Sequence, residues 1–143
     1  GDEMIDRLSF VSVPGWAPPR GYQNGVVARG RMLFVAGQVG WNAEHAFESD
    51  DLCDQFASAL DNVLAVVRAA GAGPEHVAKM TVYVTDVPAY RAGVRRIGEA
   101  WRARMGKNFP AMALVGVTEL VEPRAKVESE TVAVLDDGPG ASA

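Results

Sequence analysis

The 143-residue sequence contains a single cysteine, Cys53, and two histidines, His45 and His76. One cysteine cannot form an internal disulfide or a zinc site made of several thiolates. The histidines lie in different segments without the spacing of metal ligands, so we predict that the protein binds no metal. Cys53 lies within a stretch of helical pattern and no GxSxG motif occurs, so the sequence offers no clear nucleophile for covalent catalysis.

Long apolar runs and an excess of positive charge are also absent. No apolar stretch reaches the roughly 20 residues that span a bilayer. The opening residues, GDEMIDRLSF, are charged where a signal peptide would be apolar. The 14 basic and 18 acidic residues give a net charge of −4, which provides no overall attraction to nucleic acids or anionic membranes. The glycines form no nucleotide-binding loop. We therefore expect a cytoplasmic protein that does not bind membranes. Binding to nucleic acid is also disfavoured.

The overall composition, with 48% hydrophobic and 22% charged residues, is that of an ordinary globular domain. The length predicts one domain over residues 1–143. We expect its core to cover about residues 5–135 and its glycine-containing C-terminal tail, residues 136–143, to be loose.

Alternating and β-branched segments predict six strands, separated by stretches that contain glycine or proline. They cover residues 5–13, 24–28, 32–36, 77–85, 111–117 and 125–134. The turn Arg29-Gly30-Arg31 predicts a hairpin of the second and third strands. The polar segment 118–124 predicts another hairpin between the last two strands.

Two segments repeat apolar residues at three- and four-residue spacing, the pattern of amphipathic helices. Ser49 is expected to cap the first helix. Its apolar residues are Leu52, Phe56, Ala59, Leu60, Val63, Leu64 and Val67. The second helix carries Tyr90, Val94, Ile97 and Trp101 on one stripe and ends at Gly106. This order of elements predicts an α+β fold, with two helices packed on one face of one mostly antiparallel sheet. The other face mixes polar and apolar residues and is expected to pack against further copies of the chain.

Two acidic residues lie two positions apart on the last predicted strand. The side chains of Glu128 and Glu130 therefore leave the same face of the sheet. A carboxylate in such a place can act as a general base or position a water molecule. It can equally form an ion pair with Lys126 or with an arginine of the second helix. The residue types leave both alternatives open.

The second predicted helix is basic on its polar side. Its arginines are Arg91, Arg95, Arg96, Arg102 and Arg104. They could contact RNA or phosphate, or form a solvated face paired with acids of a neighbouring subunit. Trp16 and Trp41 lie in predicted loops, where a large aromatic residue can serve as a lid or an interface anchor. Tyr22 can line a pocket or fill a gap in the core.

Six stretches, taken in order, resemble the YjgF/RidA family, which is also called the endoribonuclease L-PSP family. They are GYQNGVV (21–27), MLFVAGQVG (32–40), LDNVLAVVRAAGAG (60–73), VAKMTVYVTDVPAY (77–90), FPAMALV (109–115) and AKVESETVAV (125–134). The resemblance implies a chorismate-mutase-like (RidA-like) fold, assembled as a homotrimer with a cleft at each subunit boundary. Characterised members hydrolyse reactive enamines and imines, such as 2-aminoacrylate, to ketoacids and ammonia. Because the imine carbon is already electrophilic, the resemblance implies no metal and no organic cofactor.

Single positions can be compared with the family's pattern. Tyr22 matches the tyrosine of the family's pocket, and Glu128 matches the glutamate that positions the attacking water. Phe109 begins the segment that leads to the family's carboxylate-binding arginine, but Met112 stands at the position of that arginine. Two smaller departures are Leu114 in place of the neighbouring cysteine and Ala36 in place of the serine of the SGQ motif.

Met112 is uncharged and cannot hold a carboxylate by an ion pair. The resemblance therefore implies a hydrolase (deaminase) of an enamine or imine with altered specificity, in which Glu128 is the catalytic residue. The residues expected to bind the small-molecule substrate in the intersubunit cleft are Tyr22, Met112, Leu114, Phe109, Ala36, Trp41 and, as a substitute cation, Arg124. One alternative is a non-catalytic trimer that acts as a small-ligand-binding or regulatory protein. Another alternative is an endoribonuclease. The acidic net charge and the lack of histidines for acid/base catalysis argue against it.

Overall fold

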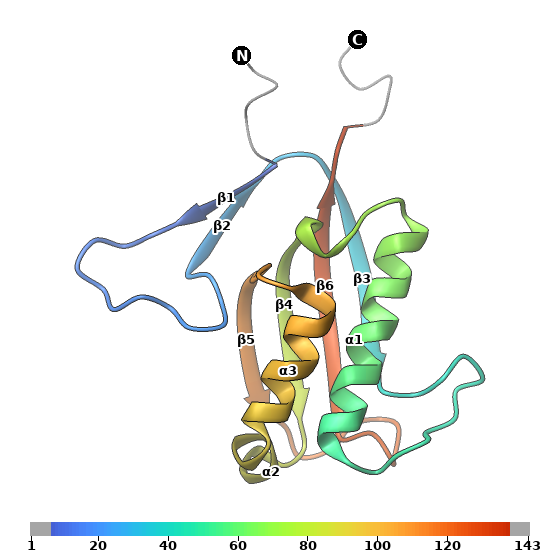
Figure 1. Cartoon of the computed structure of the whole chain (residues 1–143). Coiled ribbons are helices and arrows are strands. Elements are labelled where there is room, and N and C mark those ends of the chain that lie inside the picture. Colours follow the sequence, from blue (N-terminus) through green and yellow to red (C-terminus); the bar gives the residue numbers. More distant parts are fainter. Residues whose placement is uncertain (1–6, 138–143) are drawn as a thin grey trace.

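The computed structural model describes residues 7–137. The tail predicted from residue 136 onward lies mostly outside this range, as do the first two residues of the strand predicted over residues 5–13. The chain begins with a two-stranded antiparallel ribbon of β1 (Leu8–Val11) and β2 (Gly25–Ala28). Figure 1 shows this ribbon above β5, apart from the main sheet.

The main sheet has four strands in the order β3-β6-β4-β5. They are β3 (Arg31–Val39), β4 (Val77–Val84), β5 (Ala111–Gly116) and β6 (Val127–Leu135). The central strand β6 pairs antiparallel with both β3 and β4, whereas β5 pairs parallel with β4. The sheet is thus mostly antiparallel, with β3 and β5 at its two edges.

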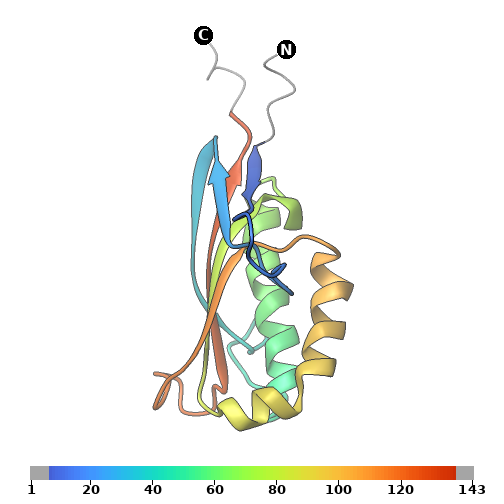
Figure 2. The ribbon, with the colours of Figure 1, turned by 90° about the vertical axis from the view of Figure 1, so that its left-hand side faces the viewer.

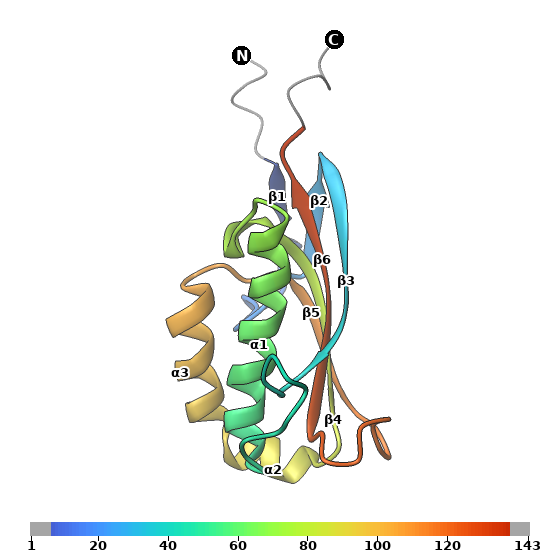
Figure 3. The same cartoon turned by 90° about the vertical axis from the view of Figure 1, so that its right-hand side faces the viewer.

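The helices all lie on one side of this sheet. They are α1 (Leu52–Ala69), α2 (Val87–Ala92) and α3 (Val94–Met105), and a short 3-10 turn, Pro74–His76, leads into β4. Figures 2 and 3 view the sheet edge-on and show that its other face is bare. The predicted α+β architecture is confirmed. Within residues 7–137, no helix is long and apolar enough to cross a membrane.

The core lies between the helices and the inner face of the sheet. Strand β4 shows the division well, because Met80, Val82 and Val84 are almost completely buried while Lys79 and Tyr83 face the bare side. Helix α1 contributes one continuous apolar stripe to this core, as its three- and four-residue spacing predicts. Burial of this stripe stabilises the fold by roughly 25 cal/mol for each Å² of apolar surface removed from water.

Both predicted hairpins are wrong. Strand β2 pairs with β1, and β3 pairs with β6, so the turn at Gly30 carries the chain from the ribbon into the main sheet. Strand β5 pairs with β4 and never with β6. A parallel pair needs a long crossover, and the segment containing α2 and α3 provides it. Strand β6 is buried along one whole face, which suits the central position that it takes.

The first helix begins two residues later than expected. Asp51, not Ser49, is its N-cap, and the Asp51 carboxylate accepts the backbone N–H of Asp54 at 2.9 Å. The Ser49 hydroxyl instead accepts the N–H of Asp51 and donates to the carboxylate of Asp54 at 2.8 Å. A carboxylate at the N-cap also suits the positive end of the helix dipole.

The second predicted helix is two helices. Gly93 ends α2 and caps α3, and the chain bends there. A β-carbon on residue 93 would lie 2.5 Å from the sulfur of Cys53 on α1. Only glycine allows the α2–α3 corner to approach α1 this closely. The apolar stripe from Tyr90 to Trp101 therefore spans a corner, and this corner shapes the pocket described below.

Candidate active site

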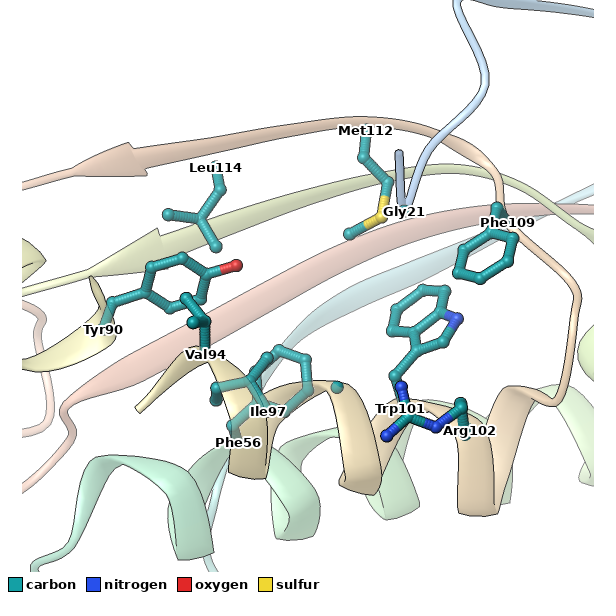
Figure 4. Close-up of a pocket in the computed structure, with 11 residues that line it drawn as sticks. Gly21, Phe56, Tyr90, Val94, Ile97, Trp101, Arg102, Phe109, Met112 and Leu114 are labelled. Atoms are coloured by element: carbon teal, nitrogen blue, oxygen red, sulfur yellow. The ribbon is translucent and has the colours of Figure 1, made fainter. Parts of the chain in front are cut away.

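A cavity of about 320 Å³ lies between α3 and the edge strand β5. Its wall is formed by Gly21, Phe56, Tyr90, Val94, Ile97, Gly98, Trp101, Arg102, Phe109, Met112 and Leu114. Figure 4 shows Met112 and Leu114 projecting from β5 toward α3, with the Trp101 and Phe109 rings at one end. The volume is at the small end of the range for ligand pockets in proteins.

The alternation of β5 places two predicted site residues in this cavity. Met112 and Leu114 are separated by two positions, so they share the face that looks toward the helices. Phe109 precedes the strand and stacks on Trp101, with ring centroids 5.9 Å apart and planes 6° from parallel. The structure therefore brings the candidate residues Phe109, Met112 and Leu114 together in one cavity.

Two polar groups interrupt the apolar wall. The side chain of Tyr90 directs its hydroxyl into the cavity, and Arg102 lies at the other end beneath the Trp101 ring (Figure 4). Burial raises the pKa of Tyr90, so its hydroxyl stays protonated and can donate a hydrogen bond at neutral pH. These two residues were not predicted as site residues. Tyr90 looks like a core residue by its helical spacing, and Arg102 looks like one of several solvated arginines.

The two carboxylates of β6 share one face of the sheet, as expected, and this is the bare face. The hydroxyl of Tyr83 donates a hydrogen bond of 2.5 Å to Oε1 of Glu130. This hydrogen bond raises the pKa of Tyr83. Among residues 7–137, neither Glu128 nor Glu130 forms an ion pair, so the predicted alternatives with Lys126 or an α3 arginine are not found.

Glu128 lies beside an irregularity of β3. Between the pairs Val35–Thr131 and Gln38–Ser129, strand β3 contains one residue more than β6, which is a β-bulge at Ala36 and Gly37. The Glu128 carboxylate packs against the α-carbon of Gly37 and fills the space that a side chain there would need. The predicted site residue Ala36 precedes Gly37 in this bulge, and the two residues lie opposite Glu130 in the pairing of β3 with β6.

Met112 and Glu128 face opposite sides of the same sheet. The Met112 side chain points to the helices, while Glu128 points to the bare face, two strands away from β5. A sheet is one backbone layer thick, so one protomer cannot apply both side chains to the same small molecule. A site that uses both must be assembled from two copies of the chain.

Tyr22 lies close to the cavity without lining it. The N–H of Gln23 donates to the carbonyl of Pro110 at 2.9 Å, and Gly21 forms part of the cavity wall. This segment therefore runs along the start of β5. The side chain of Tyr22 is 40% exposed.

Trp41 and Arg124 lie elsewhere. The Trp41 ring stacks on His45 with centroids 4.1 Å apart, within the loop between β3 and α1. Arg124 donates to the carboxylate of Asp50 at 2.9 Å and to the carbonyl of Phe47. Neither residue lines the cavity between α3 and β5. In one protomer, Arg124 therefore adds no positive charge to this cavity.

No metal centre is evident in the part of the chain that is described. No three His, Cys, Asp or Glu side chains among residues 7–137 converge as ligands. Cys53 is buried against the carbonyl of Gly93, and burial raises the pKa of its thiol. The Cys53 thiol is therefore a poor nucleophile at neutral pH.

The family described as Endoribonuclease L-PSP matches residues 16–135, and the chain belongs to this family. The resemblance seen in the sequence is confirmed. One relative is the 2-iminobutanoate/2-iminopropanoate deaminase of Escherichia coli K12, which is 34% identical over 105 residues, 73% of this chain and 80% of that protein.

Solved structures agree with this assignment. A protein of unknown function of the Rid family, YyfB from Yersinia pestis, has a TM-score of 0.81 at 30% identity, over 91% of this chain and all of that one. The YjgF gene product of Escherichia coli has a TM-score of 0.65 at 34% identity, over 79% of this chain and 87% of that one. The predicted chorismate-mutase-like fold is thus the fold of this family.

Proposed function

We propose that this protein is a hydrolase of reactive enamines or imines that works as a homotrimer. The observation that carries the proposal is the Glu128 carboxylate, placed by the glycine bulge at the β3 edge of the sheet. The relative from Escherichia coli named 2-iminobutanoate/2-iminopropanoate deaminase supports the reaction class. The cavity between α3 and β5 supplies a binding surface of suitable size.

The bare sheet face supports assembly from several copies. Phe34 and Met32 on β3 are 72% and 59% exposed, and Val115 on β5 is 42% exposed. Large apolar side chains gathered on one uncovered face are typical of an interface. Packing of this face against its copies would bring the β3 edge of one protomer, with Glu128, to the β5 edge of the next, with Met112.

The reaction needs one water molecule and one proton shuttle. Glu128 takes a proton from water as the oxygen bonds to the imine carbon, and the carbon–nitrogen double bond becomes single. The proton then passes to the nitrogen, ammonia leaves, and a carbonyl group remains. Water supplies the oxygen of the product and the hydrogens that leave with the nitrogen, so the reaction balances without a further reactant.

The cavity favours a substrate with an apolar body. Methionine at position 112 removes the bidentate ion pair that an arginine forms with a carboxylate. Leu114, Ile97 and the aromatic rings instead offer contacts to a hydrophobic side chain. We therefore propose a specificity shifted from small imino acids toward imines with branched or aromatic substituents.

The uncharged residue at position 112 also favours a second candidate, a non-catalytic trimer that binds a small ligand in the same cavity. An endoribonuclease is less well supported by the contacts of α3. Arg96 pairs with Asp51 and Asp54, Arg104 pairs with Asp61, and Arg95 lies 3.9 Å from Glu99. These arginines are already partnered by carboxylates and offer less positive charge to a phosphate backbone.

The decay of freshly generated imines from alanine, leucine and phenylalanine tests the proposal. We expect the wild type to accelerate decay, and Glu128→Gln to lower kcat by about 10²–10⁴-fold, the usual contribution of a general base. Glu130→Gln is the matched control, because it removes a carboxylate of the same strand face and should lower kcat far less. Unchanged decay with wild-type protein would reject the hydrolase, and ligand binding without turnover would leave the second candidate.

A further inference from the structure

The cavity has a positively charged residue, Arg102, in its wall, and the proposed reaction gives this residue no role. Arg102 is the one Lys or Arg among the residues that form this cavity, and all others except Tyr90 are apolar or glycine. A single cation at the end of an apolar cavity selects a ligand with one anionic end and one apolar end. Met112, which the sequence resemblance sets at the position of the family's arginine, lines the same cavity from the opposite wall.

Arg102 differs from the other arginines of its helix in its contacts. Arg95, Arg96 and Arg104 each lie within 3.9 Å of a carboxylate oxygen. Among residues 7–137, Arg102 forms no ion pair and no side-chain hydrogen bond. Its guanidinium keeps all five N–H donors available for a bound anion.

A glycine positions this guanidinium. Gly98 lies one helical turn before Arg102, and a β-carbon on residue 98 would be 3.3 Å from Nη1 of Arg102. The missing side chain leaves room for the guanidinium to lie along α3 (Figure 4), and the exposed Arg102 forms part of the cavity wall. Gly98 and the guanidinium of Arg102 thus lie together at the wall of the cavity.

We infer that Arg102 is the carboxylate anchor of this protein and that the cavity binds small aryl or branched-alkyl carboxylates. The carboxylate pairs with Arg102, the body of the ligand packs among Met112, Leu114 and Ile97, and the Tyr90 hydroxyl donates to a carbonyl or imine group at the far end. The inference rests on the proposed function, because the same cavity would hold the substrate of the hydrolase. It makes the natural substrate an imine that keeps its carboxylate, held from α3 instead of from β5.

Phenylacetate and phenylacetamide test the inference, because they share size and shape and differ in charge. Binding can be followed by NMR at the indole N–H of Trp101, a residue of the cavity wall; this N–H is buried and has no hydrogen-bond acceptor among residues 7–137. We expect phenylacetate to bind the wild-type protein about tenfold more tightly than phenylacetamide, and Arg102→Gln to reduce this ratio to about one. Arg95→Gln is the matched control and should keep the ratio, because Arg95 lies on the same helix outside the cavity.

Equal binding of the two probes by the wild type, no binding of either probe, or equal effects of Arg102→Gln and Arg95→Gln would overturn the inference. The proposed function fails separately. Selective binding of phenylacetate without any turnover of phenylalanine-derived imine keeps Arg102 as the anchor and rejects the hydrolase. Turnover that has the same KM in the wild type and in Arg102→Gln keeps the hydrolase and rejects the anchor.

Discussion

The carboxylate of Glu128 packs against Gly37, in the space that a side chain on residue 37 would occupy. The two residues lie on adjacent strands, and the β-bulge of β3 brings the glycine to the edge where the carboxylate sits. A larger residue at position 37 would have to push the carboxylate away. This relationship gives a test of Glu128 that leaves its chemistry intact.

Gly37→Ala should lower imine turnover at least tenfold while the protein stays folded. The new β-carbon collides with the end of a flexible side chain, so Glu128 moves and the backbone does not. Turnover and thermal unfolding of the variant measure the two effects. Gly25→Ala is the control, because its β-carbon would meet Val11 at an ordinary 3.4 Å. Full turnover by Gly37→Ala would argue that the place of Glu128 is unimportant for the reaction.

Phe34→Glu should break the assembly. Phe34 is 72% exposed on the bare sheet face and lies opposite Val132. A charge on each copy would have to be buried without a partner on association, which is strongly unfavourable. Light scattering should show a trimer for the wild type and a monomer for the variant, with turnover lost together with the trimer. Val121→Glu changes a residue that is 96% exposed in the loop before β6 and should leave the mass unchanged. A wild-type protein that is monomeric would rule out a cleft shared between subunits.

The sequence predicts the layers of this fold better than its strand order. Helix α1 and the alternation in β4 follow from spacing alone, because each buries one stripe or one face. The hairpins at Gly30 and at residues 118–124 were wrong because strand pairing depends on which buried faces match across the whole sheet. Strand β6, buried along one face, takes the central place although β5 precedes it in the chain.

Closeness in the sequence decides which candidate residues could be grouped before the structure was known. Met112, Leu114 and Phe109 lie close together in sequence and meet in the cavity. Tyr90 and Arg102 come from other elements, and the corner at Gly93 that directs them has no strong signal in the sequence. Arg102 becomes distinct from the other arginines only when the carboxylate partners of those arginines are known.

The Tyr83–Glu130 hydrogen bond should be visible in a titration. The bond favours the protonated phenol and raises the pKa of Tyr83, whose ordinary value is about 10. Its stabilising effect is therefore complete below pH ~10 and is lost as the pH rises through the higher pKa of the folded protein. Phenolate absorbance in a Tyr22→Phe, Tyr90→Phe background reports on Tyr83 alone. Glu130→Gln should lower the midpoint, and an unchanged midpoint would show that the bond is absent in solution.

Gly98→Ala should stabilise the protein and weaken carboxylate binding together. Alanine within α3 is favoured over glycine by about 0.5–1 kcal/mol, so the melting temperature should rise. The added β-carbon displaces the Arg102 guanidinium by a few tenths of an ångström or turns it out of the cavity, because it would lie 3.3 Å from Nη1. Phenylacetate affinity should then fall severalfold, whereas phenylacetamide affinity should change little. In an Arg102→Gln background, Gly98→Ala should still raise the melting temperature but should cause no further loss of phenylacetate affinity. This is the result expected for two residues that act through one contact. A loss of equal size in both backgrounds would mean that Gly98 affects the cavity directly and does not act by positioning Arg102.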